Sequence, residues 1–174
     1  MDLDFINKII SLDFFLDAAT SILKKDFEKF KDSRMMRIET FSLTQEILEK
    51  YTGKAALLLF FNLGKMSADS IMEEKKIKNK SVSNLINEAI DFTQQRKWIK
   101  IIDKKSFANE ISITTEWTLQ SKNRSKTNYC VCSFIEGFFE KVLSYSSDEK
   151  TFSCKEVKCL ARGDKYCEFR IKQN

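Results

Sequence analysis

The chain has 174 residues, of which 43% are hydrophobic and 32% charged, and this balance excludes a disordered chain and favours one domain with a hydrophobic core. Thirty lysines and arginines against 25 aspartates and glutamates give a net charge of +5. Because basic and acidic residues are interleaved and no basic stripe is formed, the charge pattern argues against nucleic-acid binding.

The first 33 residues predict one amphipathic helix, because apolar residues recur at three- and four-residue steps from Leu12 to Phe30. The short segment 35–41 is predicted to be a strand. Ser42 is predicted to begin a second helix, since Gln45 follows it at the spacing of a capping box. We therefore expect an N-terminal helical segment, residues 1–33, followed by one compact domain, residues 34–174.

Two further helices are expected in the middle of the chain. Gly53 interrupts the helical pattern, and the next helix, from Lys54 to about Met72, is apolar nearly all round, which predicts a buried central helix. Gly64 lies inside it, where glycine costs about 1 kcal/mol relative to alanine. We expect this glycine to allow close approach by another backbone or by a ligand. Residues 83–93 predict the third helix.

Strand-like patterns dominate the second half. Residues 98–102 and 110–119 are rich in Trp, Ile and Thr and predict strands, and residues 131–145 predict a helix. Two final strands, 151–161 and 166–171, are predicted to form a hairpin around Gly163, which can supply a positive φ. This order predicts an α+β fold, with a largely antiparallel sheet packed against helices on one face and the other face free for dimerisation.

Location and metal chemistry follow from three further features. The longest apolar run, residues 55–61, is too short to cross a bilayer, and the acidic N-terminus differs from a secretory signal, so we expect a cytoplasmic protein without a membrane span. In a reducing cytoplasm, five cysteines are more often metal ligands or buried thiols than disulfides. The chain has no histidine, so a metal site must be built from thiolates and carboxylates.

The candidate ligands lie near the end of the chain. Cys159 and Cys167 meet across the predicted hairpin, Cys132 lies near the start of the preceding helix, and Glu156 adds a carboxylate. Three thiolates and one carboxylate can fill the tetrahedral shell of zinc, and thiolate-rich sites also accept iron. These four residues are our predicted metal site.

Three points leave this assignment open. In a straight strand, Glu156 and Cys159 would lie on opposite faces, so they can share an ion only if the strand bulges or bends. Cys130 and Cys154 could each replace a proposed ligand. All five cysteines could also be small buried hydrophobes that bind no metal.

The closing residues resemble the 4-vinyl reductase domain family. The pattern E-x-x-C-x-A-x-G-D-x-x-C-x-F occupies residues 156–169, and weaker similarity upstream extends the resemblance over residues 34–172. The resemblance, to the stand-alone archaeal type, implies a hydrocarbon-binding module with a fold like that of TRAPP subunits, which dimerises through helices. It also implies a zinc ion held by Cys132, Glu156, Cys159 and Cys167.

Three functions compete. The first is a non-catalytic sensor or binding module for a hydrocarbon or aromatic molecule, with structural zinc, because four protein ligands leave no open position for water. The second is a scaffold dimer of the TRAPP type. The third, a reductase, is disfavoured by the lack of a nucleotide fingerprint and of histidine for acid–base work. Large apolar residues expected to face the chamber of a sensor are Leu58, Phe61, Met66, Trp98, Trp117 and Phe134.

Overall fold

The computed structural model describes residues 38–76, 80–107, 109–147 and 150–174. The predicted N-terminal helix, residues 1–33, lies outside the described residues, so the predicted division of the chain is not tested. The described helices and strands are α2 (Ile38–Thr52), α3 (Ala55–Glu74), α4 (Val82–Gln95), β1 (Ile99–Ser106), β2 (Glu110–Thr118), α5 (Ser133–Leu143), β3 (Phe152–Lys158) and β4 (Cys167–Gln173).

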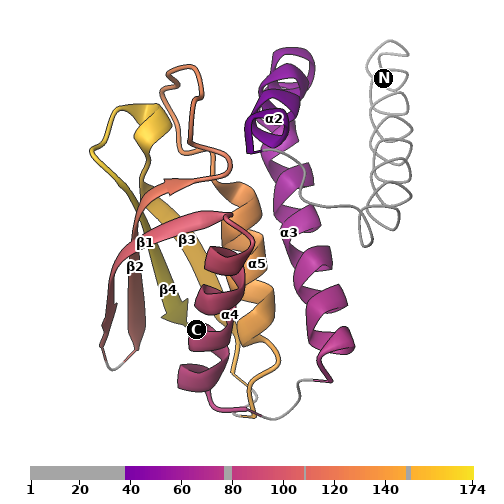
Figure 1. Ribbon diagram of the computed structural model, residues 1–174, viewed down its shortest axis with the longest axis vertical. Coiled ribbons are helices and arrows are strands. Elements are labelled where there is room, and N and C mark those ends of the chain that lie inside the picture. Colours follow the sequence, from indigo (N-terminus) through magenta and orange to yellow (C-terminus); the bar gives the residue numbers. More distant parts are fainter. Residues whose placement is uncertain (1–37, 77–79, 108, 148–149) are drawn as a thin grey trace, which may run out of the picture. The chain divides into compact units, whose positions relative to one another are not determined.

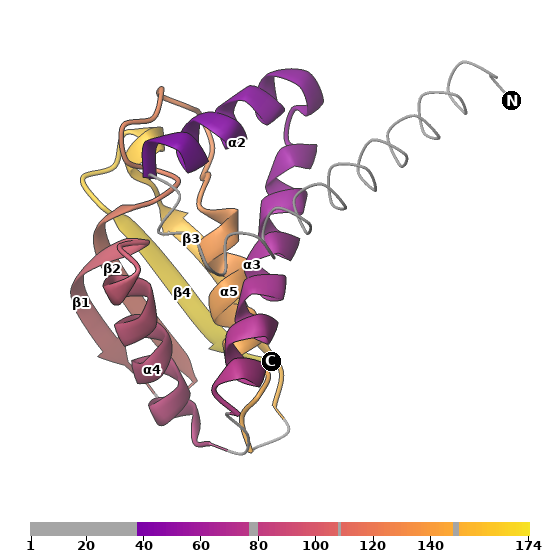
Figure 2. The same ribbon diagram turned by 45° about the vertical axis from the view of Figure 1, so that its right-hand side comes forward.

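The four strands form one antiparallel sheet in the order β1-β2-β4-β3. Helices α4 and α5 cover one face of this sheet, and α5 lies between the sheet and α3 (Figures 1 and 2). The predicted α+β class, with an antiparallel sheet packed against helices, is therefore confirmed. The sheet order places β3 at an edge, where α5 supplies acceptors: Glu136 accepts a hydrogen bond from the backbone N–H of Glu156 at 2.7 Å.

The face of the sheet that the helices leave uncovered carries ion pairs. Lys100 pairs with Glu116 at 2.6 Å between β1 and β2, and Lys172 pairs with Glu110 at 3.5 Å between β4 and β2. Such charged cross-strand pairs suit a solvated surface. These pairs therefore argue against this face as the dimerisation surface expected from the sequence.

Two glycines set the distance between α3 and α5. A Cβ atom added to Gly64 would lie 2.1 Å from the carbonyl oxygen of Phe134, and one added to Gly137 would lie 2.0 Å from that of Phe61. Each glycine therefore admits the backbone of the other helix. The expectation that Gly64 allows a close backbone approach is confirmed.

The beginning of α2 corrects the sequence prediction. Residues 38–41, predicted as part of a strand, are helical, so Ser42 lies inside α2 and does not cap it. The Ser42 hydroxyl instead donates to the backbone oxygen of Gln120 at 3.3 Å. A tertiary hydrogen-bond partner far along the chain, which local spacing cannot show, explains why a polar residue is buried here.

Most of the core is aromatic. Phe41 contacts Phe60 and Phe134, with ring centroids 5.2 and 5.1 Å apart, and Trp98 lies 5.1 Å from Phe134. Trp98 continues the chain of rings to Phe138 at 5.4 Å. These separations suit edge-to-face packing, which adds to the stabilisation from burial. The phenylalanines of the described residues thus serve mainly as core.

One described helix, α3, is long and apolar enough to cross a membrane by length and composition alone, although 44% of its most apolar window is buried inside the domain. A core helix of a soluble protein passes the same test. Because α3 packs along α5 through Gly64 and Gly137, its apolar composition has an explanation within this fold.

Candidate metal centre

The structure brings the four predicted metal ligands together. One ligand atom from each of Cys132, Glu156, Cys159 and Cys167 lies within 4.8 Å of all the others, and all four residues are buried. The sulfur atoms of Cys132 and Cys167 are 4.0 Å apart. Separations of this size fit four ligands around a single ion, because Zn–S bonds of about 2.3 Å place tetrahedral sulfurs a little under 4 Å apart.

A bulge in β3 resolves the geometric difficulty of Glu156 and Cys159. The register of β3 with β4 shifts between Glu156 and Lys158, and Cys159 lies just beyond the end of the strand. The irregularity changes the direction of the chain, so both side chains reach the cluster. Strand alternation alone could not indicate this bend.

The residues of the closing motif that bind no ion shape the turn between the thiols. Asp164 accepts a hydrogen bond from the backbone N–H of Cys159 at 2.8 Å, which closes the turn. Gly163 has φ +103°, in the left-handed region that favours glycine. Ala161 and Phe169 are buried. The motif therefore specifies a turn that returns Cys167 to Cys159.

Backbone N–H groups point at the ligand atoms. Cys132 donates to Glu156 Oε2 at 2.9 Å, Leu160 donates to Cys167 Sγ at 3.4 Å, and the N–H of Val131 donates to the Cys159 sulfur. Donors of this kind stabilise negative charge on sulfur and oxygen and hold ligands in place. The other carboxylate oxygen of Glu156, Oε1, is buried and has no hydrogen-bond partner among the described residues. A cation is the partner that this oxygen lacks.

The protonation of the cluster also suits a cation. Burial raises the pKa of Cys132 and of Glu156 well above their ordinary values. Hydrogen bonds from the thiols of Cys130, Cys132 and Cys167 lower the pKa of Cys159. The metal-free cluster therefore keeps its negative charge on Cys159, and an incoming dication would displace the protons of the other ligands.

The two remaining cysteines lie outside this group. Cys154 is fully buried on β3, near Glu136 and Glu140, and is not among the four converging residues. Cys130 is half-buried, and its hydrogen bond to Cys159 raises its pKa. The structure therefore favours neither as a replacement for the predicted ligands, although Cys130 adjoins the cluster.

A buried amide pair that the sequence analysis missed supports the segment before Cys132. Gln120 donates to Gln45 at 2.6 Å, and both side chains donate to the carbonyl of Val131 at 2.9 Å. The Gln120 side-chain oxygen accepts from the N–H of Phe134 at 3.0 Å, at the N-terminus of α5. These residues fix the backbone on both sides of Cys132, and no local sequence signal marks two glutamines 75 residues apart as partners.

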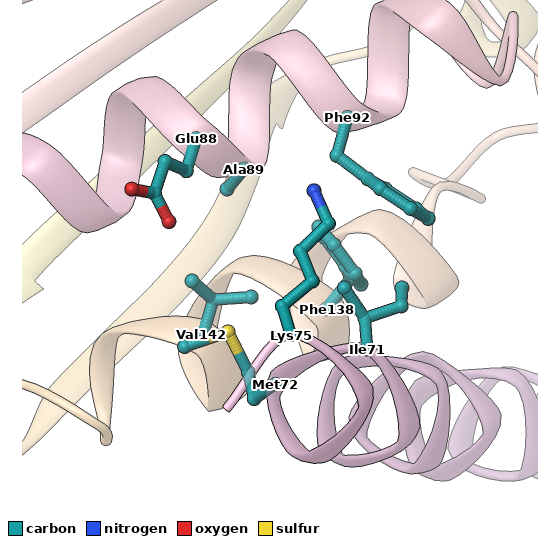
Figure 3. Close-up of a pocket in the computed structure, with 8 residues that line it drawn as sticks. All are labelled: Ile71, Met72, Lys75, Glu88, Ala89, Phe92, Phe138 and Val142. Atoms are coloured by element: carbon teal, nitrogen blue, oxygen red, sulfur yellow. The ribbon is translucent and has the colours of Figure 1, made fainter. Parts of the chain in front are cut away.

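The predicted pocket residues are dispersed. Phe134 is core, Trp98 packs in the aromatic chain, Leu58 is 62% exposed, and Lys122 lies over the ring of Trp117. None of the six predicted residues lines the pocket shown in Figure 3. That pocket lies between α3, α4 and α5, and its walls are Ile71, Met72, Lys75, Glu88, Ala89, Phe92, Phe138 and Val142.

The pocket is nearly closed. Its open volume is about 10 Å³, roughly that of one water molecule. Figure 3 shows Lys75 extending from α3 toward Phe92 of α4, and its Nζ lies 5.3 Å from the centre of the Phe92 ring. Any larger molecule must displace side chains such as Lys75, Phe92 and Met72.

The fold and the cluster define an α+β domain with a closed set of three thiols and one carboxylate. Residues 125–173 match the family model of the 4-vinyl reductase domain. The match covers the four ligands and the closing motif, and it confirms the resemblance to the 4-vinyl reductase family in this part of the chain. No curated protein sequence matches the chain.

Solved structures share the fold at low sequence identity. The phenol-responsive sensory domain of the transcription activator PoxR has a TM-score of 0.63 at 14% identity, covering 81% of this chain and 76% of that chain. An H-NOX protein from S. oneidensis has a TM-score of 0.56 at 11% identity, covering 97% of each chain. A vinyl-4-reductase family protein from Methanocaldococcus jannaschii has a TM-score of 0.49 at 19% identity, covering 88% of this chain and 93% of that chain. The first two likenesses establish the fold alone, and the third is too distant to support an inference.

Proposed function

We propose that the chain is a non-catalytic binding or sensor module for small apolar or aromatic molecules, braced by a structural zinc ion. The observation that carries this proposal is the closed donor set of Cys132, Glu156, Cys159 and Cys167, with ligand atoms within 4.8 Å of one another. Four protein ligands fill a tetrahedral shell and leave no position where a substrate could bind the ion. The ion would therefore act on structure, and the function would lie in ligand binding.

The position of the ion indicates what it braces. Its ligands come from β3, from the turn after β3, from the first residue of β4 and from the N-cap residue of α5. An ion there ties the edge hairpin to the helix that lines the apolar pocket through Phe138 and Val142. The PoxR domain, which shares the fold, is described as phenol-responsive, and this supports ligand binding as the function of the module.

Binding is tested with purified metal-loaded protein and a panel of toluene, naphthalene, phenol and hexane, followed by thermal unfolding. We expect a concentration-dependent rise in melting temperature with at least one apolar compound, since a ligand that binds only the folded state stabilises it by about 2.7 kcal/mol at a hundred times its Kd. Ala89→Leu, which adds volume to the pocket wall, should abolish that rise. Lys75→Ala is the matched control: it opens the mouth and should keep or strengthen binding. If no compound shifts the wild-type protein, the proposed function is wrong.

A homodimer, the second proposal, is favoured by an apolar stripe on α2 and α3. Leu43, Ile47 and Tyr51 recur at four-residue spacing on α2 and are 56%, 44% and 82% exposed, and Leu58 of α3 is 62% exposed. Large exposed apolar groups on one helix face are typical of an interaction surface. A scaffold or dimeric sensor would use this stripe, because the uncovered face of the sheet carries ion pairs.

Sedimentation analysis tests the dimer. We expect Ile47→Glu together with Tyr51→Glu to raise the dimer dissociation constant at least tenfold, because two charges would be buried in an apolar interface. The control is Ile102→Glu, at an equally exposed apolar residue (58%) on β1. A wild-type protein that stays monomeric at high micromolar concentration would contradict the proposal, as would equal effects of the variant and its control.

A further inference from the structure

A buried arginine near the metal centre lacks partners for most of its donors. The side chain of Arg124, in the loop between β2 and α5, is 0% exposed, and its Nη2 pairs with Glu49 of α2. Its Nε and Nη1 are buried and have no hydrogen-bond partner among the described residues. The guanidinium is always charged, and an unsatisfied donor on a buried charge is costly. Two such donors therefore point to a group that occupies this site.

The surroundings indicate the charge of that group. The Tyr129 hydroxyl donates to Glu49 at 2.8 Å, and the Lys54 ammonium lies 5.3 Å from the centre of the Tyr129 ring. Two cations, Arg124 and Lys54, thus face one carboxylate, Glu49, which leaves a single net positive charge. Lys54 is also the residue before α3, a helix of 20 residues that has no side-chain cap and no acidic residue in its first turn. The helix dipole adds positive potential at this end.

We propose that Arg124 binds the carboxylate of a small monoanionic organic acid, at a site separate from the apolar pocket between α3, α4 and α5. Nε and Nη1 lie on different edges of the guanidinium, so each would donate a single hydrogen bond. A monoanion fits the single net positive charge, whereas a doubly charged phosphate exceeds it. The phenol ring of Tyr129 offers an apolar surface beside the carboxylate.

The site is connected to the metal centre. Glu49 accepts a hydrogen bond from Gln45 at 2.8 Å, and Gln45 donates to the carbonyl of Val131, next to Cys132. A carboxylate that takes donors from Arg124 would change the pairing of Arg124 with Glu49. That change reaches the segment before Cys132 through only one side chain. Occupancy of the anion site would therefore be felt at the metal ligands.

The test is titration of the metal-loaded full chain with benzoate, and with benzamide as the neutral analogue, at constant ionic strength. NMR follows the Arg124 Nε–Hε resonance, which reports on the guanidinium of the wild-type protein directly. Benzoate should shift this resonance with saturation, and benzamide should not. Arg124→Met should weaken benzoate binding on the order of tenfold to a hundredfold, the range for hydrogen bonds to charged groups. Arg170→Met, at a half-exposed arginine on the outer face of the sheet, is the control and should leave binding unchanged.

A second variant gives a change of the opposite sign. Glu49→Gln removes the carboxylate that competes for Arg124 and keeps an acceptor for Tyr129, so benzoate should bind more tightly. Equal shifts with benzoate and benzamide, no saturable shift, or unchanged affinity in both the Arg124 and Glu49 variants would overturn the proposal and indicate that buried water satisfies Arg124. Those results leave the binding of toluene and naphthalene in the apolar pocket untouched, so the two proposals fail separately.

Discussion

Replacing Cys167 with alanine is expected to remove the bound metal and to lower the free energy of unfolding by about 4 kcal/mol, the contribution of a ligand present at a thousand times its Kd. Cys154→Ala should cost only about 1 kcal/mol, as an ordinary core substitution does. Both cysteines are 0% exposed, so loss of burial affects them alike. Only Cys167 has its sulfur among the four converging ligand atoms. For a chain of this size, the difference corresponds to roughly 10 °C in melting temperature.

Elemental analysis and thermal unfolding measure this prediction together. Wild type and Cys154→Ala should hold one metal ion per chain, and Cys167→Ala should hold none. A strong chelator should lower the melting temperatures of the first two proteins toward that of Cys167→Ala, which itself should not respond. The absorption spectrum identifies the ion, because iron thiolates are coloured and zinc thiolates are not.

Two results would contradict a metal centre. One is wild-type protein that contains no metal after expression in zinc-supplemented medium. The other is equal destabilisation by the two substitutions, with no effect of the chelator. Either would mean that the four residues are a buried thiol cluster. The unpartnered Oε1 of Glu156 would then remain without an explanation.

The sequence predicts the composition of the candidate site better than its geometry. The four ligands follow from the closing motif and from the upstream thiol, because ligand chemistry restricts the residue types. The bulge after Glu156 was recognised only as a requirement, since a register shift depends on the pairing of β3 with β4. Gln45 and Gln120 left no local signal, because their partnership is entirely tertiary.

Burial explains the remaining errors. Leu58 lies in a run of apolar residues that predicts a helix buried all round, yet α3 turns this residue to solvent near its N-terminus. Arg124 belongs to a basic stretch that is typical of a solvated loop, yet Glu49 of α2 draws its side chain inside. Hydrophobicity and charge show which residues can be buried. Only the three-dimensional arrangement decides which of them are.

Replacing Gly64 or Gly137 with alanine should destabilise the protein by about 3 kcal/mol or more, the upper range for overpacking a core. Helix propensity alone predicts the opposite sign, since alanine in a helix is favoured over glycine by about 1 kcal/mol. The added Cβ would lie 2.1 Å from the carbonyl oxygen of Phe134 or 2.0 Å from that of Phe61. Neither oxygen belongs to a flexible side chain, so α3 and α5 would have to move apart and lose packing along their contact.

Gly53→Ala is the control for this pair of substitutions. Gly53 has φ +59° and nothing within 4 Å of an added Cβ, so the cost there is only backbone strain, about 1 to 2 kcal/mol. Denaturant unfolding of the metal-loaded proteins measures all three variants. Because Gly64 and Gly137 separate the same two backbones, the double variant should cost less than the sum of the single ones. Stabilisation by Gly64→Ala would show that α3 and α5 are not in backbone contact, and α5 would then lack the support that holds Cys132 toward the cluster.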